Sequence, residues 1–144
     1  MTALDEIDQA ILDELRRDAR ASMTAIADAV HISRAGAHAR IKRLTDSGVI
    51  TGYTVRTDPA LLGHHSSAYV TLAIEQATWQ VVQERLRAIP EVEHMALVGG
   101  DFDVILLVRA NDARHLRRIV LEDIQAIPSI RSTRTTLIFE DFAR

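Results

Sequence analysis

The residues best suited to bind another molecule are four basic side chains in the first third of the chain. The segment 32–45 contains no Asp or Glu and carries Arg34, Arg40, Lys42 and Arg43. Basic side chains neutralise phosphate groups, and arginine also pairs with the edge of guanine through two hydrogen bonds. The segment therefore predicts a surface for nucleic acid, with a merely solvated helix face as the alternative.

A second group of candidate ligands is the run Gly99-Gly100-Asp101-Phe102-Asp103. Exposed backbone N–H groups beside two glycines can bind a carboxylate, and an aspartate can bind an ammonium group. A free amino acid needs both kinds of partner. The run is also typical of a tight turn before a strand, in which Asp favours the turn. For Asp103 a purely structural role is the alternative.

Other chemistry has little support in the sequence. The chain has no cysteine, which excludes disulfides and thiolate metal sites within it. Its six histidines show no helical i, i+4 pair and no tight cluster, so we predict no metal site and no cofactor. Asp101 and Asp103 could form a carboxylate pair, but no nucleophile–base set or phosphate loop accompanies them, so we do not expect an enzyme. The histidines are His31, His38, His64, His65, His94 and His115.

The composition is that of a folded protein, with 47% hydrophobic and 26% charged residues among 144. No apolar run approaches the ~20 residues of a membrane span. The acidic start MTALDEIDQ lacks the basic and apolar regions of a signal peptide. We therefore expect a cytoplasmic protein without a membrane partner. The net charge of −3 does not oppose nucleic-acid binding, because the distribution of charge matters more than its sum.

Three short helices are predicted around the basic segment. Asp5, Ser22 and Ser33 are suitable N-caps, and Gly48 follows the third helix at a suitable C-terminal position. In the third helix the apolar positions 37, 41 and 44 share one side, so the basic residues fall mainly on the other. Three helices of this kind form the core of a helix-turn-helix, whose last helix enters the DNA major groove.

The N-terminal part of that recognition helix meets base edges, so we predict base reading by Arg34, Ala35 and His38. The later basic residues are better placed for phosphates, which position a protein without reading sequence. For Arg40, a salt bridge to the acids of the first helix is the alternative. The complete set of predicted DNA contacts is Ser33, Arg34, Ala35, His38, Arg40, Lys42 and Arg43.

The remainder of the chain predicts a second domain with an internal repeat. RAIPEV at 87–92 is echoed by QAIPSI at 125–130, and each follows a helical pattern and precedes a strand pattern. Strand patterns at 68–75, 92–98, 102–109 and 130–139 complete the order β-α-β-β-α-β, the ferredoxin-like motif. The fold class is therefore α+β. We expect a helix-turn-helix domain, winged-helix-like, over 1–56 with a linking strand at its end, a linker over 57–65, and the second domain over 66–144.

Two helices should cover one face of the four-stranded antiparallel sheet and leave the other face uncovered within the chain. Some of the residues expected on that other face are apolar. An apolar sheet face is usually buried, so we predict that a second copy covers it in a homo-oligomer.

The ordered set of short motifs resembles the Lrp/AsnC (leucine-responsive, or feast/famine) family of prokaryotic transcription regulators. The resemblance spans nearly the whole chain, and its specificity lies in the set rather than in one piece. The motifs are LDEID at 4–8 with IL at 11–12, DAR at 18–20, IS at 32–33, RIKRL at 40–44, GVITGY at 48–53, Pro59, Gly63, PEV at 90–92 and GDFD at 100–103.

The resemblance implies a regulator that binds double-stranded DNA through its N-terminal domain. It implies homodimers formed through the sheet, which in many members assemble into octamers. It also implies an amino acid or related metabolite, bound at subunit interfaces, that changes assembly or DNA affinity. The effector residues that it implies are Gly99, Gly100, Asp101 and Asp103, with Thr133 and Thr135 of the last strand.

Three residues depart from the family pattern. His31 stands in the turn where glycine is frequent, in a left-handed conformation that His tolerates. Gly36 lies inside the recognition helix and should cost ~1 kcal/mol relative to alanine, and Ala37 is smaller than usual at an inner position. We therefore expect a recognition helix that is looser than typical until DNA orders it. The departures keep open an alternative function, an effector-binding oligomer whose specific DNA binding is weak or lost.

Overall fold

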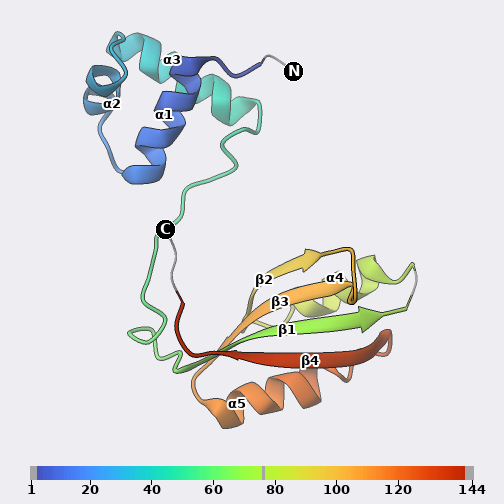
Figure 1. The fold of residues 1–144 in the computed structure, drawn as a ribbon. Coiled ribbons are helices and arrows are strands. Elements are labelled where there is room, and N and C mark those ends of the chain that lie inside the picture. The colour runs from blue at the N-terminus through green and yellow to red at the C-terminus, as the bar shows by residue number, and fades with distance from the viewer. Residues whose placement is uncertain (1–2, 76, 142–144) are drawn as a thin grey trace. The chain divides into compact units, whose positions relative to one another are not determined.

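The chain divides into two compact units, residues 1–56 and 57–144 (Figure 1). The structure is a computed structural model that describes residues 3–75 and 77–141. Within these ranges every helix is too short or too polar to span a lipid bilayer.

The first unit contains α1 (Glu6–Arg17), α2 (Met23–Ala29) and α3 (Arg34–Asp46). Each begins after the predicted N-cap, because the side chains of Asp5, Ser22 and Ser33 accept hydrogen bonds from backbone N–H groups that the first turn leaves unpaired. His31 joins α2 to α3 with φ of 56°, the predicted left-handed conformation. The helix-turn-helix prediction is confirmed.

Apolar residues from all three helices form the core of this unit. Ile11 of α1, Ile26 of α2 and Leu44 of α3 are almost completely buried and belong to one cluster. Ala37 is also buried, at the inner position that the sequence predicted. Because these residues recur at helical spacing on α3, the opposite side of that helix stays exposed.

Residues 49–56 form no strand in the described chain, where the sequence predicted a linking strand. The segment is exposed, with Tyr53 at 56% and Val55 at 80% of their accessible surface. A β-rich composition gives only a propensity, because a strand also needs a partner for its backbone N–H and C=O groups. The ladders of the described sheet do not reach this segment.

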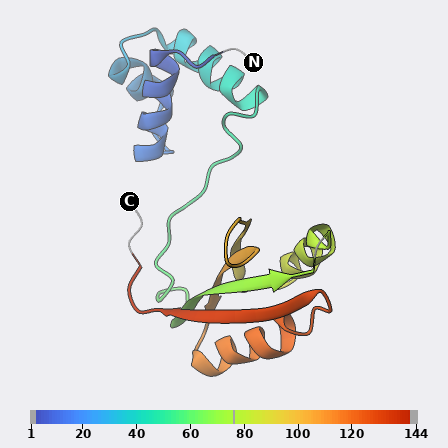
Figure 2. The ribbon, with the colours of Figure 1, turned by 45° about the vertical axis from the view of Figure 1, so that its right-hand side comes forward.

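The second unit is a four-stranded antiparallel sheet with the strand order β2-β3-β1-β4. Its strands are β1 (Ser66–Ile74), β2 (Val92–Leu97), β3 (Val104–Ala110) and β4 (Ile130–Ile138), and β1 and β4 lie side by side in both ribbon views (Figure 1, Figure 2). The helices are α4 (Trp79–Arg87) between β1 and β2, and α5 (Ala113–Arg118) with its continuation η1 (Ile119–Ile124) between β3 and β4. This order confirms the predicted β-α-β-β-α-β fold.

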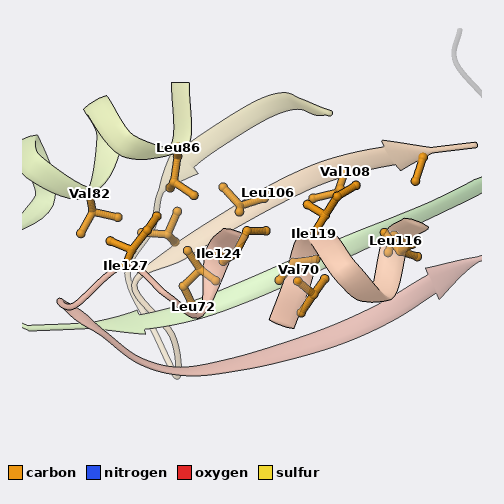
Figure 3. Close-up of a cluster of buried hydrophobic side chains, with 14 of the residues drawn as sticks. Val70, Leu72, Val82, Leu86, Leu106, Val108, Leu116, Ile119, Ile124 and Ile127 are labelled. Carbon is orange, nitrogen blue, oxygen red and sulfur yellow. The ribbon is translucent and has the colours of Figure 1, made fainter. Parts of the chain in front are cut away.

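Both helical segments pack on the same face of the sheet. The inward positions of β1 and β3 alternate along each strand, and Val82 and Leu86 of α4 approach them together with Ile119 and Ile124 of η1 (Figure 3). All of these side chains are buried. η1 is a wider π-helical turn, which brings Ile119 and Ile124, five residues apart, onto the core side.

The internal repeat has the same backbone hydrogen bonds in its two copies. The N–H of Ile89 donates to the Leu86 carbonyl and that of Val92 to the Ile89 carbonyl. At the equivalent positions the N–H of Ile127 donates to Ile124 and that of Ile130 to Ile127. The repeated sequence therefore encodes a repeated turn from helix into strand.

The opposite face of the sheet carries no helix among the described residues. Its residues include the neighbouring pairs Tyr69 with Leu107 and Thr71 with Ile105 on β1 and β3. Tyr69 is 43% exposed although it lies on a central strand. We call this surface the open face.

Candidate nucleic-acid interface and effector loop

The exposed side of α3 is a narrow ridge of mostly small residues. Ala35, Ala39 and Lys42 are exposed and lie opposite the buried residues of the helix. Small side chains let the backbone of a helix approach the floor of a groove closely, and alanine can contact a thymine methyl group. Ala35 was predicted from the sequence; Ala39 was missed, and its signal was its position four residues further on the same face.

Arg34 and His38 lie on one flank of this ridge. Both are exposed, and together with Ala35 and Met23 of α2 they line a depression. No ion pair joins Arg34 to any residue in 3–75 or 77–141. The three predicted base-reading residues are therefore grouped at the N-terminal part of α3, with their polar groups accessible.

Arg40 and Arg43 lie on the other flank and are bound to the acids at the start of α1. Arg40 Nη1 donates to Asp5 at 2.6 Å and to Asp8 at 2.7 Å. Arg43 Nη2 donates to both carboxylate oxygens of Asp8, at 2.6 and 2.7 Å. The salt bridge that the sequence left as an alternative for Arg40 is thus present, and Arg43 shares it.

Asp8 is the centre of this cluster. Its side chain is completely buried, and its carboxylate also accepts from the N–H of Asp5 in a capping box. Burial raises the pKa of Asp8, but the hydrogen bonds from Arg43 and Arg40 outweigh it and lower the pKa to about 2. The hydrogen bond from Arg40 likewise lowers the pKa of Asp5. Both acids are therefore ionised at neutral pH.

The remaining basic residue of α3, Lys42, forms an exposed ion pair with Asp46 one turn later. The sequence prediction treated the segment 32–45 as free of acids, which is true along the chain. In the fold, however, three aspartates from outside that segment bind three of its four cations.

Gly36 lies in the first turn of α3, three residues after the N-cap Ser33. Its N–H donates to Ser33 Oγ at 3.1 Å, and a Cβ at this position would lie 3.2 Å from that oxygen. The helix is continuous from Arg34 to Asp46. The expected cost of a glycine in a helix interior therefore does not apply in full, because residues in the first turn make fewer helical hydrogen bonds.

The loop 99–103 joins β2 to β3. Gly100 has φ of 138°, a conformation that side chains rarely adopt. Asp101 is exposed and carries no hydrogen bond or ion pair within the described chain. The loop thus combines a glycine backbone at positive φ with an accessible carboxylate.

Asp103 has a structural role. Its carboxylate accepts from the N–H of Ile74 at 2.8 Å, its own N–H donates to Leu72 at 2.9 Å, and its carbonyl accepts from Val98. These bonds fix the loop to the end of β1. This is the alternative that the sequence left open for Asp103.

Thr133 and Thr135 lie on the helix-covered face of the sheet, because they pair with the inward residues Leu72 and Val70. Thr133 Oγ1 accepts from Gln125 at 2.6 Å, and Thr135 lines an apolar depression beside α5. Thr133 shares a cross-strand row with Leu72 and Val104, which places its backbone ~10 Å from the end of the loop. The described chain therefore does not bring these threonine side chains and Asp101 into one site.

No group of three or more His, Asp or Glu side chains in residues 3–75 and 77–141 is arranged to hold a metal ion.

Comparison with known proteins agrees with this architecture. Residues 4–51 match the winged helix-turn-helix DNA-binding family, and residues 67–144 match the Lrp/AsnC ligand binding domain. The second match alone covers more than half of the chain. The chain belongs to the Lrp/AsnC family of transcription regulators.

Similar family members come from archaea and bacteria. An uncharacterized HTH-type transcriptional regulator of Pyrococcus abyssi is 34% identical over 135 residues, which are 94% of this chain and 85% of the relative. The regulator AldR of Mycolicibacterium smegmatis is 34% identical over 140 residues, 95% of this chain and 82% of its own. A solved feast or famine regulatory protein from M. tuberculosis complexed with L-methionine is 34% identical, with a TM-score of 0.90 over 99% of this chain and 96% of that chain.

Membership in the Lrp/AsnC family confirms the resemblance and the fold that the sequence predicted. The family consists of transcription regulators rather than enzymes, so the prediction that this protein is not an enzyme is also confirmed. The protein is a DNA-binding transcription regulator with a ligand-binding domain.

Proposed function

We propose that the protein regulates transcription in response to an amino acid or a related metabolite, which binds at the loop 99–103. The observation that carries the proposal is the exposed carboxylate of Asp101 beside the left-handed backbone of Gly100. The backbone N–H groups suit a ligand carboxylate and Asp101 suits its ammonium group. The L-methionine complex of a relative that is 34% identical supports this class of ligand.

The roles of the effector residues differ. Gly99, Gly100 and Asp101 contact the ligand, while Asp103 holds the loop in place through its bond to Ile74. Thr135 is exposed and contributes where a second copy brings the ligand to it, whereas Thr133 contributes only after its hydrogen bond with Gln125 is released.

A second copy covers the open face. Its apolar centre, around Leu107 and Ile105, faces no other described element of the chain. Arg109, at one end of that face, is already satisfied by Glu93, Ser67 and Asp141. Apolar surface at the centre and paired charge at the edge are the usual arrangement of an oligomer interface. This surface supports a homodimer; the assembly of dimers into octamers is a property of many family members and not of this surface.

The DNA-binding residues belong to two groups. Arg34, Ala35 and His38 read base edges in the major groove, and Ser33 caps the helix close to the phosphates. Arg40, Lys42 and Arg43 contact phosphates, which compete with the carboxylates bound to these side chains. The domains act as the sequence divides them, 1–56 on DNA and 66–144 on effector and partner copy, in the cytoplasm, where the DNA of a prokaryote lies.

The test is a DNA-binding titration with the full chain and the DNA upstream of its own gene, at two salt concentrations, with and without a panel of amino acids. We expect specific, salt-sensitive binding that one amino acid changes. Specific binding that no amino acid changes would contradict the effector role. Absence of specific binding to that DNA and to a pool of genomic fragments would favour an effector-binding oligomer without a DNA target.

A further inference from the structure

The recognition helix presents far less positive charge than its sequence suggests. Its four cations are Arg34, Arg40, Lys42 and Arg43, and three of them are bound to Asp5, Asp8 or Asp46 at hydrogen-bonding distance. The three carboxylates leave a net charge of one positive unit for this group of seven side chains.

The ion pairs of Asp5 and Asp8 with the arginines do not depend on pH near neutrality. Asp8 has a pKa of about 2 and the pKa of Asp5 is lowered as well, so neither acid takes up a proton near neutrality. Arginine also keeps its charge in proteins. The ion pairs can therefore change only by exchange of partners, for example when a DNA phosphate competes with a carboxylate.

The distribution of the pairs follows the two roles of α3. Arg34, on the flank proposed to read bases, has no acid bound to it within the described chain, and Ala35 and His38 lie beside it. The paired cations are those on the ridge and on the opposite flank, where phosphates are the expected partners. The acids thus accompany the residues that bind every DNA sequence equally.

We propose that Asp5, Asp8 and Asp46 form an electrostatic filter, which restricts the sequence-independent part of DNA binding by neutralising the phosphate-facing cations of α3. Sequence-independent affinity comes from cations that neutralise phosphates and release counterions. A cation already bound to a carboxylate releases fewer counterions, because the phosphate must first displace the carboxylate. Base contacts by Arg34 are unaffected, so the acids lower only the phosphate-derived part of the affinity, for operator and random DNA alike.

The filter rests on the proposed DNA contacts of α3 but predicts something separate from them. A helix without these acids would keep the same operator and would bind both that operator and random DNA more strongly. Asp46 is the acid whose effect on DNA binding is easiest to separate from an effect on stability, because its exposed i, i+4 pair with Lys42 adds little to the stability of a fold.

The experiment uses the full chain with Asp5→Asn, Asp46→Asn and the double variant. Asparagine is as good an N-cap as aspartate, so Asp5→Asn keeps the start of α1 while it removes one of the two carboxylates bound to Arg40 and leaves the pair with Asp8. Asp13→Asn is the matched control, because it removes one exposed negative charge that is paired with Arg16 of α1 and not with α3. Screening at 0.1 M salt limits effects beyond a Debye length of about 10 Å.

The measurement is the dissociation constant for a random-sequence duplex and for the best operator over a series of salt concentrations. Freeing Lys42 by Asp46→Asn should steepen the slope of log affinity against log salt by about 0.9 per DNA-binding domain, which corresponds to roughly an eightfold gain for random DNA at 0.1 M salt. Asp5→Asn should add a smaller change, because Arg40 stays paired with Asp8. The gain should be similar for the operator and for random DNA, so their ratio should stay near the wild-type value, while Asp13→Asn should match the wild type in both affinities.

Two results would overturn the filter. An unchanged slope in the double variant would mean that the carboxylates do not compete with phosphates. A weaker affinity for random DNA would mean that the acids position the cations for phosphates instead of masking them. Failure of the proposed function would give a different result, because the wild type would then prefer no operator sequence. The salt slopes on random DNA would still show whether the carboxylates compete with phosphates.

Discussion

The carboxylate of Asp103 accepts a hydrogen bond from the backbone N–H of Ile74, 2.8 Å away and 29 residues earlier in the chain. The same residue is joined to Leu72 and Val98 through its backbone. One aspartate thus connects the end of β1, the end of β2 and the loop that precedes β3. The loop proposed to bind the effector is held in place by a residue that need not touch the effector.

Replacing Asp103 should therefore act on stability. Asp103→Ala leaves the partly buried N–H of Ile74 without its acceptor, which costs about 1–3 kcal/mol of the free energy of unfolding. Urea denaturation followed by circular dichroism measures this loss. Asp103→Asn keeps an acceptor oxygen and should lose less. Equal stability of Asp103→Ala and the wild type would contradict the structural role.

Replacing Asp101, two residues earlier, should change the effector response and leave the stability nearly unchanged. Its side chain is exposed, so Asp101→Ala should leave the free energy of unfolding within about 0.5 kcal/mol of the wild-type value. It should also abolish the response of DNA binding to the effector, without changing DNA binding in its absence. Calorimetric titration of the amino acid found in the panel measures the loss. A retained response would remove Asp101 from the site.

The open face gives a prediction about assembly. Leu107→Asp places a charge at the apolar centre of that face, where a partner copy would have to bury it without a partner charge. Sedimentation velocity should then show a smaller species than the wild type. Val81→Asp, at a residue of α4 that is 58% exposed, is the control and should sediment like the wild type. Unchanged assembly of Leu107→Asp would place the interface elsewhere.

Arg34 tests the assignment of base reading to one flank of α3. Arg34→Ala should weaken operator binding by ~1–3 kcal/mol and relax the preference at one base position. Selection of binding sites from a randomised DNA pool, compared between the variant and the wild type, measures the relaxation. A uniform loss of affinity for all sequences would assign Arg34 to a phosphate instead.

The sequence was informative wherever a local pattern decides the structure. The N-caps Asp5, Ser22 and Ser33, the left-handed His31 and the repeated IP turns all follow from residues close together in the chain, and the structure has them as expected. Helical and strand periodicity gave the faces of α3 and of the sheet in the same way.

What the sequence did not decide depends on contacts between distant segments. Asp8 and Arg43 are 35 positions apart in the chain, so no local pattern indicated their ion pair, and the basic segment was expected to present more charge than it does. The orientation of Thr133 follows from its register with Leu72, which no local pattern specifies. Residues 49–56 have strand-forming side chains but no partner strand in the described chain, and a propensity cannot supply one.

The cluster around Asp8 makes the stability of the first unit depend on acid pH. The pKa of Asp8 falls from its ordinary value of 3.8 to about 2 on folding, so the unfolded chain binds the proton more tightly. The stabilisation is therefore complete above about pH 5 and is lost as the pH falls through about 2. Linkage gives a contribution of about 2–3 kcal/mol for a shift of this size. Urea unfolding of the full chain between pH 5 and 2, followed by helical circular dichroism, measures it.

Asp8→Asn should be less stable at pH 7 and should lose less of its stability over this range, whereas Asp13→Asn should follow the wild type. Parallel pH profiles for Asp8→Asn and the wild type would show that the buried carboxylate does not supply this dependence.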